Sequence, residues 1–259
     1  MIRPLRFLID LLFPPKCCFC GKIVFTHRDD VCPACWDTLP ELSGGERRLD
    51  AMQKWQPPAQ RAAPGFDAGA TQPLDGAATP SPTPALPDGM QLEAAVRCVS
   101  ALRYEGGVRR GFLRYKFSGD YWLGEVFGEI MAGVIFEALD GEFDAVTWAP
   151  LSSRRRRKRG YDQAKILAET VAERLGFPLV PTLIKKRDTA ANSSLTSAAD
   201  RAPNVSGAYD VLPDAANLRL LLIDDILTTG ATLSECARAL IDGGAESVVC
   251  AVFAEADGT

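Results

Sequence analysis

Residues 220–233 read LLLIDDILTTGATL, and this stretch decides the fold of the chain. Its apolar first part is typical of a strand that is buried on both faces of a parallel sheet. Asp224 and Asp225 follow at the expected carboxyl end of that strand, which is the edge where open α/β sheets bind their ligands. A helix pattern begins near Thr232. The stretch therefore predicts an α/β fold with a ligand site at the ends of its strands.

The residues after the two acids suit a phosphate group, and they are Thr228, Thr229, Gly230, Ala231 and Thr232. Small residues let backbone N–H groups approach a phosphate, hydroxyls add donors, and a helix N-terminus supplies positive potential. The acids instead suit the hydroxyls of a sugar, or a magnesium ion that bridges them. A sugar with a 5′-phosphate satisfies both halves of the motif. The alternative is a strand end whose acids and threonines only cap the next helix.

Composition places the chain among ordinary globular proteins. Its 259 residues are 47% hydrophobic and 24% charged, and this length allows one large domain or two smaller ones. The net charge of −4 argues against broad nonspecific affinity for nucleic acid. The apolar stretch 7–13 is too short to span a membrane, and no signal-peptide cleavage site follows it. We expect a short helix that docks on the body rather than a membrane-surface anchor, and a reducing cytoplasm around the protein.

Five of the eight cysteines lie between residues 17 and 35. Cys17 and Cys20 form one Cys-x-x-Cys knuckle, and Cys32 and Cys35 form a second. Thiolates on two such turns can converge on one tetrahedral zinc ion, which would be structural because four thiolates leave no position for water. The alternative is unligated cysteines in a frayed segment.

The remaining thiols and the single histidine have lesser roles in this interpretation. Cys18 is the spare cysteine of the cluster, and His27 is an alternative zinc ligand. Cys98, Cys236 and Cys250 stand singly in apolar surroundings and are expected in the core. With its lone histidine inside the cysteine segment, the chain is not a Ser-His-Asp or Cys-His hydrolase.

Three regions follow from the patterns: 1–45 with the first helix and the zinc segment, 46–91 as a flexible linker rich in Pro and Ala, and 92–259 as the enzyme body. Strands alternate with helices in the body, which predicts a parallel sheet with right-handed crossovers. The expected strands are 92–103, 143–149, 179–184, 218–223 and 247–253, and the expected helices are 109–117, 123–139, 163–175 and 232–242.

Two further segments carry charge that could meet an anion. Leu151 and Ser152 follow an expected strand, and six consecutive cations occupy 154–159. Because like charges repel, an anion must approach this run or the segment stays mobile. Arg159 and Gly160 lie closest to the next helix and are the favoured pyrophosphate residues. For 154–158, a solvated basic face or a nucleic-acid contact is an equal alternative.

The long polar segment 185–209 has no periodicity, which in a compact domain suggests a lid that excludes water from the reacting sugar. Lys185, Arg187 and Arg201 could then reach pyrophosphate when the lid closes. An ordinary mobile loop explains the composition equally well.

LLIDDILTTGATL resembles the 5-phosphoribosyl-1-pyrophosphate (PRPP) motif of the type I phosphoribosyltransferases. Together with LIDLLFPPKCCFCG, RKRGYDQAKILAE and NVSGAY, it makes the chain similar to the ComF family, which joins a zinc segment to such a domain. The resemblance implies that Asp224 and Asp225 hold the ribose 2′- and 3′-hydroxyls and that 228–232 hold the 5′-phosphate. It also implies a type I phosphoribosyltransferase-like parallel sheet flanked by helices.

The chain departs from this family pattern in three places. Many relatives carry a second pair of knuckles where this chain has its Pro/Ala-rich linker, so we expect one zinc ion. Asp162 adds a negative charge where relatives have an amide, and Asn192 stands where a glutamine is common early in the lid. The chemistry of the lid is therefore less defined than PRPP binding.

The resulting hypothesis is a cytoplasmic, magnesium-dependent phosphoribosyltransferase, linked by resemblance to DNA uptake or nucleotide salvage. Asp224, Asp225 and Arg159 would carry the catalysis, and the phosphoribosyl acceptor stays undefined because no purine or pyrimidine pocket is evident. The alternative is a noncatalytic adaptor that contacts single-stranded DNA or a competence helicase, with PRPP only as a regulator. Either function is compatible with a homodimer.

Overall fold

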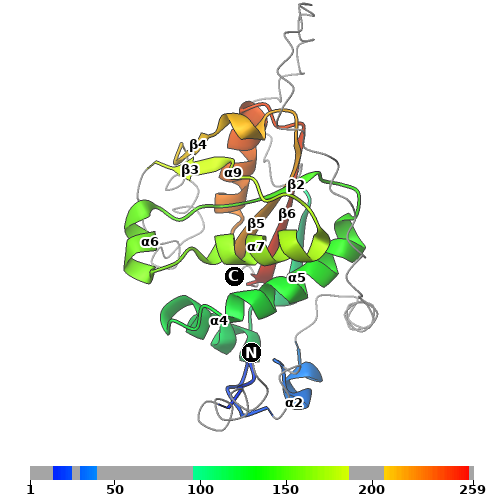
Figure 1. The fold of residues 1–259 in the computed structure, drawn as a ribbon, viewed down its shortest axis with the longest axis vertical. Coiled ribbons are helices and arrows are strands. Elements are labelled where there is room, and N and C mark those ends of the chain that lie inside the picture. Colours follow the sequence, from blue (N-terminus) through cyan, green and yellow to red (C-terminus); the bar gives the residue numbers. More distant parts are fainter. Residues whose placement is uncertain (1–13, 25–29, 40–95, 187–206, 257–259) are drawn as a thin grey trace, which may run out of the picture.

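The computed structural model describes residues 14–24, 30–39, 96–186 and 207–256 (Figure 1). In these ranges a four-stranded sheet has the order β1-β6-β5-β2, and all of its strands are parallel. The strands are β1 (Cys98–Arg103), β2 (Ala145–Trp148), β5 (Arg219–Leu227) and β6 (Ser247–Glu255). A separate antiparallel pair consists of β3 (Leu183–Lys185) and β4 (Tyr209–Val211). The predicted α/β class with a parallel sheet is confirmed.

Helices cover both faces of the sheet (Figure 1). One face carries α5 (Leu123–Leu139) and α7 (Gln163–Leu175), which pack against each other, with α4 (Gly106–Phe117) beside them. The opposite face carries α9 (Ala231–Asp242). Short elements complete the fold: α2 (Pro33–Trp36), α6 (Ser153–Arg159) and the 3-10 turn η3 (Pro213–Ala215).

Strand β5 explains why the chain folds around residues 220–223. Leu221 and Ile223 belong to the core under α5 and α7, whereas Leu220 and Leu222 belong to the core under α9. Alternate side chains of a strand point to opposite faces of its sheet, so a continuous apolar run is needed where both faces are covered. All four side chains are fully buried.

The strand is longer than its apolar run, which changes the position of the two acids. The pairing of β5 with β2 stops at Trp148 and Ile223, but its pairing with β6 continues to Leu227 and Glu255. Asp224 and Asp225 therefore lie inside the last part of β5, not after its end as the sequence suggested. One side of this part of the strand has no neighbouring strand among the described residues, and the cavity described below lies there.

Two other expectations need correction. The cationic run is helical as α6, because the Ser152 hydroxyl accepts a hydrogen bond from the Arg155 N–H at 3.3 Å and Gly160 ends the helix with φ of 86°. The two caps therefore form this helix despite the repulsion between its like charges. The expected strand 179–184 is also divided: Leu179 forms a single bridge to Val146 of β2, and only β3 continues into a ladder, with β4.

The helices 123–139 and 163–175 have the predicted bounds, and α4 begins three residues before the predicted 109. The first helix, the linker 46–91, His27, Asn192, Arg187 and Arg201 lie outside the described residues. Within the described ranges, none of the helices combines the length and the apolar character needed to cross a bilayer.

Candidate functional site

A cavity of about 230 Å³ opens beside the carboxyl ends of β2 and β5. Its lining includes most of the residues that the sequence singled out, among them Leu151, Arg159, Lys185, Asp224, Asp225, Thr228, Gly230, Ala231 and Thr232. These residues come from five different parts of the fold, between β2 and the start of α9. The structure therefore brings the predicted acids, the predicted phosphate loop and three predicted anion-binding segments to one place.

The two acids differ in their surroundings. The Asp225 N–H donates to Asp224 Oδ1 at 2.8 Å, and Asp225 Oδ2 lies 3.0 Å from Lys116 Nζ. Burial, and then the negative charge of Asp225, raise the pKa of Asp224 to about 8. Asp224 is consequently protonated in much of the protein at neutral pH, and a cation or a hydroxyl donor entering the cavity would favour its ionised form.

The loop after β5 presents backbone groups, more than side chains, to the cavity. Gly230 has φ of 74° and precedes α9, so the first amide groups of a 12-residue helix face this end of the cavity. Thr228 and Thr232 also line the cavity, but Thr229 does not. The Thr229 hydroxyl is buried with no hydrogen-bond partner among the described residues, beside a second, more apolar cavity.

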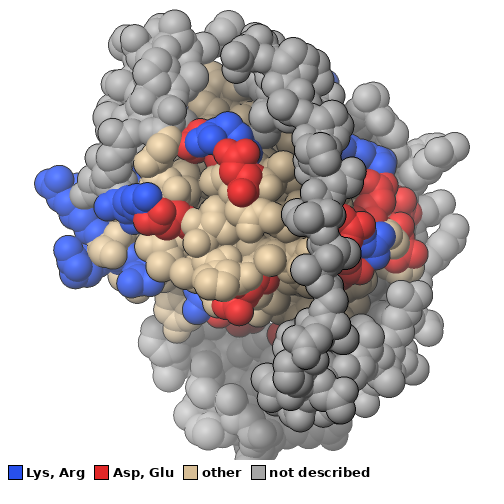
Figure 2. Space-filling view, turned by 90° about the horizontal axis from the view of Figure 1, so that it is seen from above, with Lys and Arg blue, Asp and Glu red and all other residues tan. Residues whose placement is uncertain are grey.

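Helix α6 directs two cations into the cavity. Arg155 and Arg159 are one turn apart and line it, whereas Arg154, Arg156, Arg157 and Lys158 are exposed. Arg159 donates to Gln163 Oε1 at 2.9 Å, which fixes the guanidinium against the start of α7. Lysine and arginine side chains gather at the left of Figure 2, on the side of the molecule where α6 lies in Figure 1. The helical period thus separates the run into an inner pair and an outer face.

Asp162 holds the segment before α6 in place. Its carboxylate accepts hydrogen bonds from the Leu151 N–H at 2.9 Å and from the Lys165 N–H at 3.4 Å. The first bond fixes the loop after β2, and the second caps α7. Burial raises the pKa of Asp162. Ser152 and Gly160 do not line the cavity; they start and end α6 and so set the direction of its arginines.

The antiparallel pair β3–β4 supplies a further cation. Lys185 Nζ donates to the Tyr209 hydroxyl at 3.0 Å and lies 4.8 Å from the centre of the same ring. Tyr209 is buried, so it gives this long side chain a fixed support beside the cavity. Sequence reasoning selected Lys185 as part of a lid and did not select Tyr209.

Sequence reasoning also did not select Tyr104 and Lys116 of the cavity, and it left Arg155 undecided between an anion contact and a solvated face. Lys116 lies near the end of α4, more than a hundred residues before its partner Asp225, and no local pattern links them. The signal that could have found Arg155 was available, because a helical period puts positions 155 and 159 on one face.

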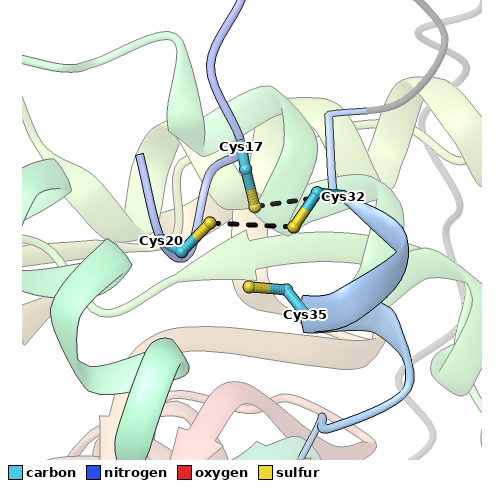
Figure 3. A group of neighbouring side chains, drawn as sticks. All are labelled: Cys17, Cys20, Cys32 and Cys35. Atoms are coloured by element: carbon cyan, nitrogen blue, oxygen red, sulfur yellow. Dashed lines mark hydrogen bonds between the residues drawn. The ribbon is translucent and has the colours of Figure 1, made fainter. Parts of the chain in front are cut away.

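The four predicted zinc ligands form a compact cluster (Figure 3). The Sγ atoms of Cys17, Cys20, Cys32 and Cys35 all lie within 4.8 Å of one another. Cys20 and Cys32 are 3.7 Å apart between their Sγ atoms, and the Cys32 N–H donates to Cys17 Sγ at 3.3 Å. Four sulfur donors at these separations fit a structural zinc ion. Cys18 is fully buried and lies outside the cluster, as expected of the spare cysteine.

The thiols of the cluster differ in acidity, because burial raises the pKa of Cys35 whereas hydrogen bonds lower that of Cys17. The pKa of the Cys17 thiol is lowered to about 3, chiefly by a hydrogen bond from the Cys18 side chain, with backbone N–H groups adding to the effect.

Of the other cysteines, Cys236 and Cys250 are buried as predicted. Cys98 is exposed, so its assignment to the core was wrong; it begins β1 at the edge of the sheet.

Comparison with known proteins agrees with both parts of the structure. The family model of the double zinc ribbon domain matches residues 8–46, and that of the phosphoribosyl transferase domain matches residues 162–258. The chain is similar to proteins of the ComF family. Its two regions are a zinc ribbon and a phosphoribosyltransferase-type domain with a parallel sheet flanked by helices.

Three relatives illustrate the likeness. The chain is 31% identical to competence protein ComFC of Streptococcus pneumoniae over 147 residues, 56% of this chain and 62% of that protein. It is 26% identical to competence protein F of Haemophilus influenzae over 142 residues, 52% and 62% of the two chains. It is 34% identical to DNA utilization protein YhgH of Salmonella typhi over 106 residues, 40% and 46% of the two chains. The matched region thus spans less than two thirds of each relative.

Proposed function

We propose that the protein binds PRPP with magnesium in the cavity beside β5 and transfers the phosphoribosyl group to an acceptor. One observation carries the proposal: a single cavity of about 230 Å³ contains a group suited to each part of PRPP. Two acids suit the ribose, helix amides suit the 5′-phosphate, and cations from α4, α6 and β3 suit pyrophosphate.

The arrangement gives the ligand one orientation. The 5′-phosphate would lie on the amides at Gly230, Ala231 and Thr232, because the first turn of α9 leaves those N–H groups without helical partners. The ribose hydroxyls would then lie against Asp224 and Asp225. The pyrophosphate would point toward Arg159 and Lys185, the cations on the far side of the acids. Magnesium would be held by PRPP oxygens and, through the ribose hydroxyls or water, by the two acids, and would supply neutralising charge to the leaving group.

The protein's own charges would assist bond cleavage at the sugar. Positive charge that develops on the ribose ring is stabilised by nearby carboxylates, and negative charge on departing pyrophosphate is stabilised by guanidinium and ammonium groups already in position. Arg159 is fixed by Gln163 and Lys185 by Tyr209, so neither side chain must be ordered during the reaction. In this role Lys116 would balance the charge of Asp225 before the ligand arrives.

The proposal is tested by calorimetric titration of the zinc-loaded chain with PRPP and magnesium. The double variant Asp224→Asn/Asp225→Asn should lose binding, while Asp242→Asn, on an exposed ion pair of α9, should keep it. Single-turnover release of pyrophosphate with candidate acceptors then tests transfer. A folded wild-type chain that binds no PRPP would remove the proposal.

A second candidate function rests on the outer face of α6. Its exposed cations lie outside the cavity, and the relatives carry names that refer to competence and DNA utilization. The protein would then be an adaptor in DNA uptake, contacting single-stranded DNA or a helicase, with PRPP as a regulator. Affinity for single-stranded DNA should fall steeply with salt, and Arg154→Gln/Arg157→Gln should reduce the slope. If the affinity of the variant and of the wild type for DNA depends equally on salt, the outer face of α6 is not the DNA-binding surface.

Several expectations from the sequence stay predictions. They are the boundaries at 45/46 and 91/92, a single zinc ion, a homodimer, the cytoplasmic location, and the roles of Arg187 and Arg201 in binding pyrophosphate. The described zinc segment packs into the core of the body through Phe19, so we propose that the two regions act as one unit.

A further inference from the structure

Helix α4 connects the zinc cluster to the cavity. Its first half contacts the Cys17–Cys20 turn, and its second half ends at Lys116 in the cavity wall. A change at the cluster therefore has a short, direct route to the site.

The contact at the zinc end is unusually close. Cys18 and Phe19, which lie between two of the zinc ligands, have almost no exposed surface. A Cβ atom added at Gly111 of α4 would lie 2.5 Å from the Cys18 carbonyl oxygen and 3.2 Å from the Phe19 ring. Only glycine permits this approach of turn and helix. Arg114, one turn further along α4, donates to the Cys17 carbonyl at 3.4 Å.

Aromatic packing extends the contact into the core. The Phe19 ring stacks on Phe127 of α5 with a centroid separation of 6.0 Å, and Phe112 of α4 stacks on the same Phe127 at 6.3 Å. Phe112 also meets Tyr115 edge to face at 5.7 Å. Cores at native density move as packed units, so displacing Phe19 displaces the rings that position α4.

At the cavity end, α4 reaches the site by two routes. Lys116 Nζ lies 3.0 Å from Asp225 Oδ2 and 5.2 Å from the centre of the Phe112 ring. The Tyr115 hydroxyl donates to the Gln163 carbonyl at 2.9 Å, and the Gln163 side chain accepts from Arg159. One end of the helix thus positions a cation on the acids and supports a cation for pyrophosphate.

We propose that occupancy of the zinc cluster controls the affinity of the cavity for its phosphate-bearing ligand, and that α4 carries the coupling. The identity of that ligand rests on the proposed function, whereas the coupling itself does not. With zinc bound, four sulfur bonds hold the turn that seats Cys18 and Phe19 on α4. Without zinc, the turn is held only by weaker hydrogen bonds, so α4 and Lys116 gain alternative positions.

The first test compares zinc-loaded and chelator-stripped full chain by calorimetry with PRPP and magnesium. Coupling of ordinary size predicts a loss of affinity of about tenfold on removing zinc. Coupling is reciprocal at equilibrium, so PRPP should raise the affinity of the chain for zinc, measured by competition with a chromophoric chelator, by a similar factor. Equal affinity with and without zinc would overturn the proposal.

A pair of glycine variants separates coupling from general loss of stability. Gly111→Ala overpacks the contact between α4 and Cys18, and Gly128→Ala overpacks the contact between α5 and Thr170, with the added Cβ 2.5 Å from its neighbour in both cases. With zinc bound, Gly111→Ala should weaken PRPP binding and speed zinc release, whereas Gly128→Ala should change neither. If both variants weaken binding in proportion to their loss of stability, the proposal is wrong.

Hydrogen exchange without any ligand distinguishes this proposal from the proposed function. Removing zinc should raise amide exchange in 112–117 and 224–227, while α9 and β4 keep their protection. This result in a chain that binds no PRPP would support the coupling and reject the proposed ligand. Unchanged exchange, or an equal rise throughout the chain, would overturn the coupling even if PRPP binds.

Discussion

Replacing Asp224 by asparagine should make the protein more stable while weakening its ligand site. The carboxyl group lies in a buried place beside a second acid, so its ionised form is disfavoured in the folded chain. Asparagine has the same shape and carries no charge. Its side-chain oxygen can still accept the hydrogen bond that Asp225 N–H now gives to Asp224 Oδ1 at 2.8 Å.

The sign and size of the effect follow from the titration of Asp224. Its pKa rises from 3.8 to about 8 on folding, so the folded chain binds this proton more tightly than the unfolded chain does. The wild type therefore loses stability as pH rises from about 4 to about 8, and is level above that range. The full shift corresponds to roughly 6 kcal/mol. Because a buried amide also loses its water, we expect a gain of roughly 3 kcal/mol for Asp224→Asn at pH 8 and little gain at pH 4.

Urea unfolding of both proteins from pH 4 to pH 9, in magnesium-free buffer, measures this difference. Asp242→Asn is the matched control, because that acid is exposed and paired with Arg238. The free energy of unfolding of Asp224→Asn should stay nearly level where that of the wild type falls. If the free energy of unfolding of Asp224→Asn depends on pH in the same way as that of the wild type, the assigned burial and charge of Asp224 are refuted. The same variant should bind PRPP and magnesium more weakly, as expected where a group needed for function lowers the stability of the fold.

Three further predictions concern the cations and the metal. Lys116→Met should weaken PRPP binding tenfold or more in calorimetry, since a charge-assisted contact is worth about 1.5–3 kcal/mol; unchanged affinity would remove Lys116 from the site. Arg159→Gln should reduce the affinity for inorganic pyrophosphate about tenfold by the same reasoning, while Arg157→Gln, on the outer face of α6, should leave it unchanged. Elemental analysis should find one zinc per chain and none in Cys35→Ser, which should also unfold at a lower temperature; two zinc ions per chain would contradict the single four-cysteine site.

Sequence alone was sufficient where the signal is local. The apolar run of β5 predicted a strand buried on both faces, because each of its side chains had to be apolar for either core to form. The spacing of the cysteines predicted the metal cluster for a similar reason, since each Cys-x-x-Cys turn brings two sulfur atoms together without help from the rest of the fold.

Sequence was insufficient where the outcome depends on pairing between distant segments. The end of β5 was placed too early, because whether Asp224 to Leu227 remain in a strand depends on β6, not on their own apolar character. The helix α6 forms because of its caps, Ser152 and Gly160, whereas the charge pattern of the run alone indicates only repulsion. Lys116 was missed because only the packing of α4 against α5 and the zinc turn brings it to Asp225.

The unequal lengths of two neighbouring strands account for the position and the character of the cavity together. Strand β2 ends at Trp148, so the chain leaves the sheet and turns into α6, while β5 continues beside β6 to Leu227. The acids of β5 thereby face the space that β2 has left, and the arginines of α6 face the same space from its other side. The arginines of α6 and the acids of β5 therefore meet across this space although they are far apart in the sequence.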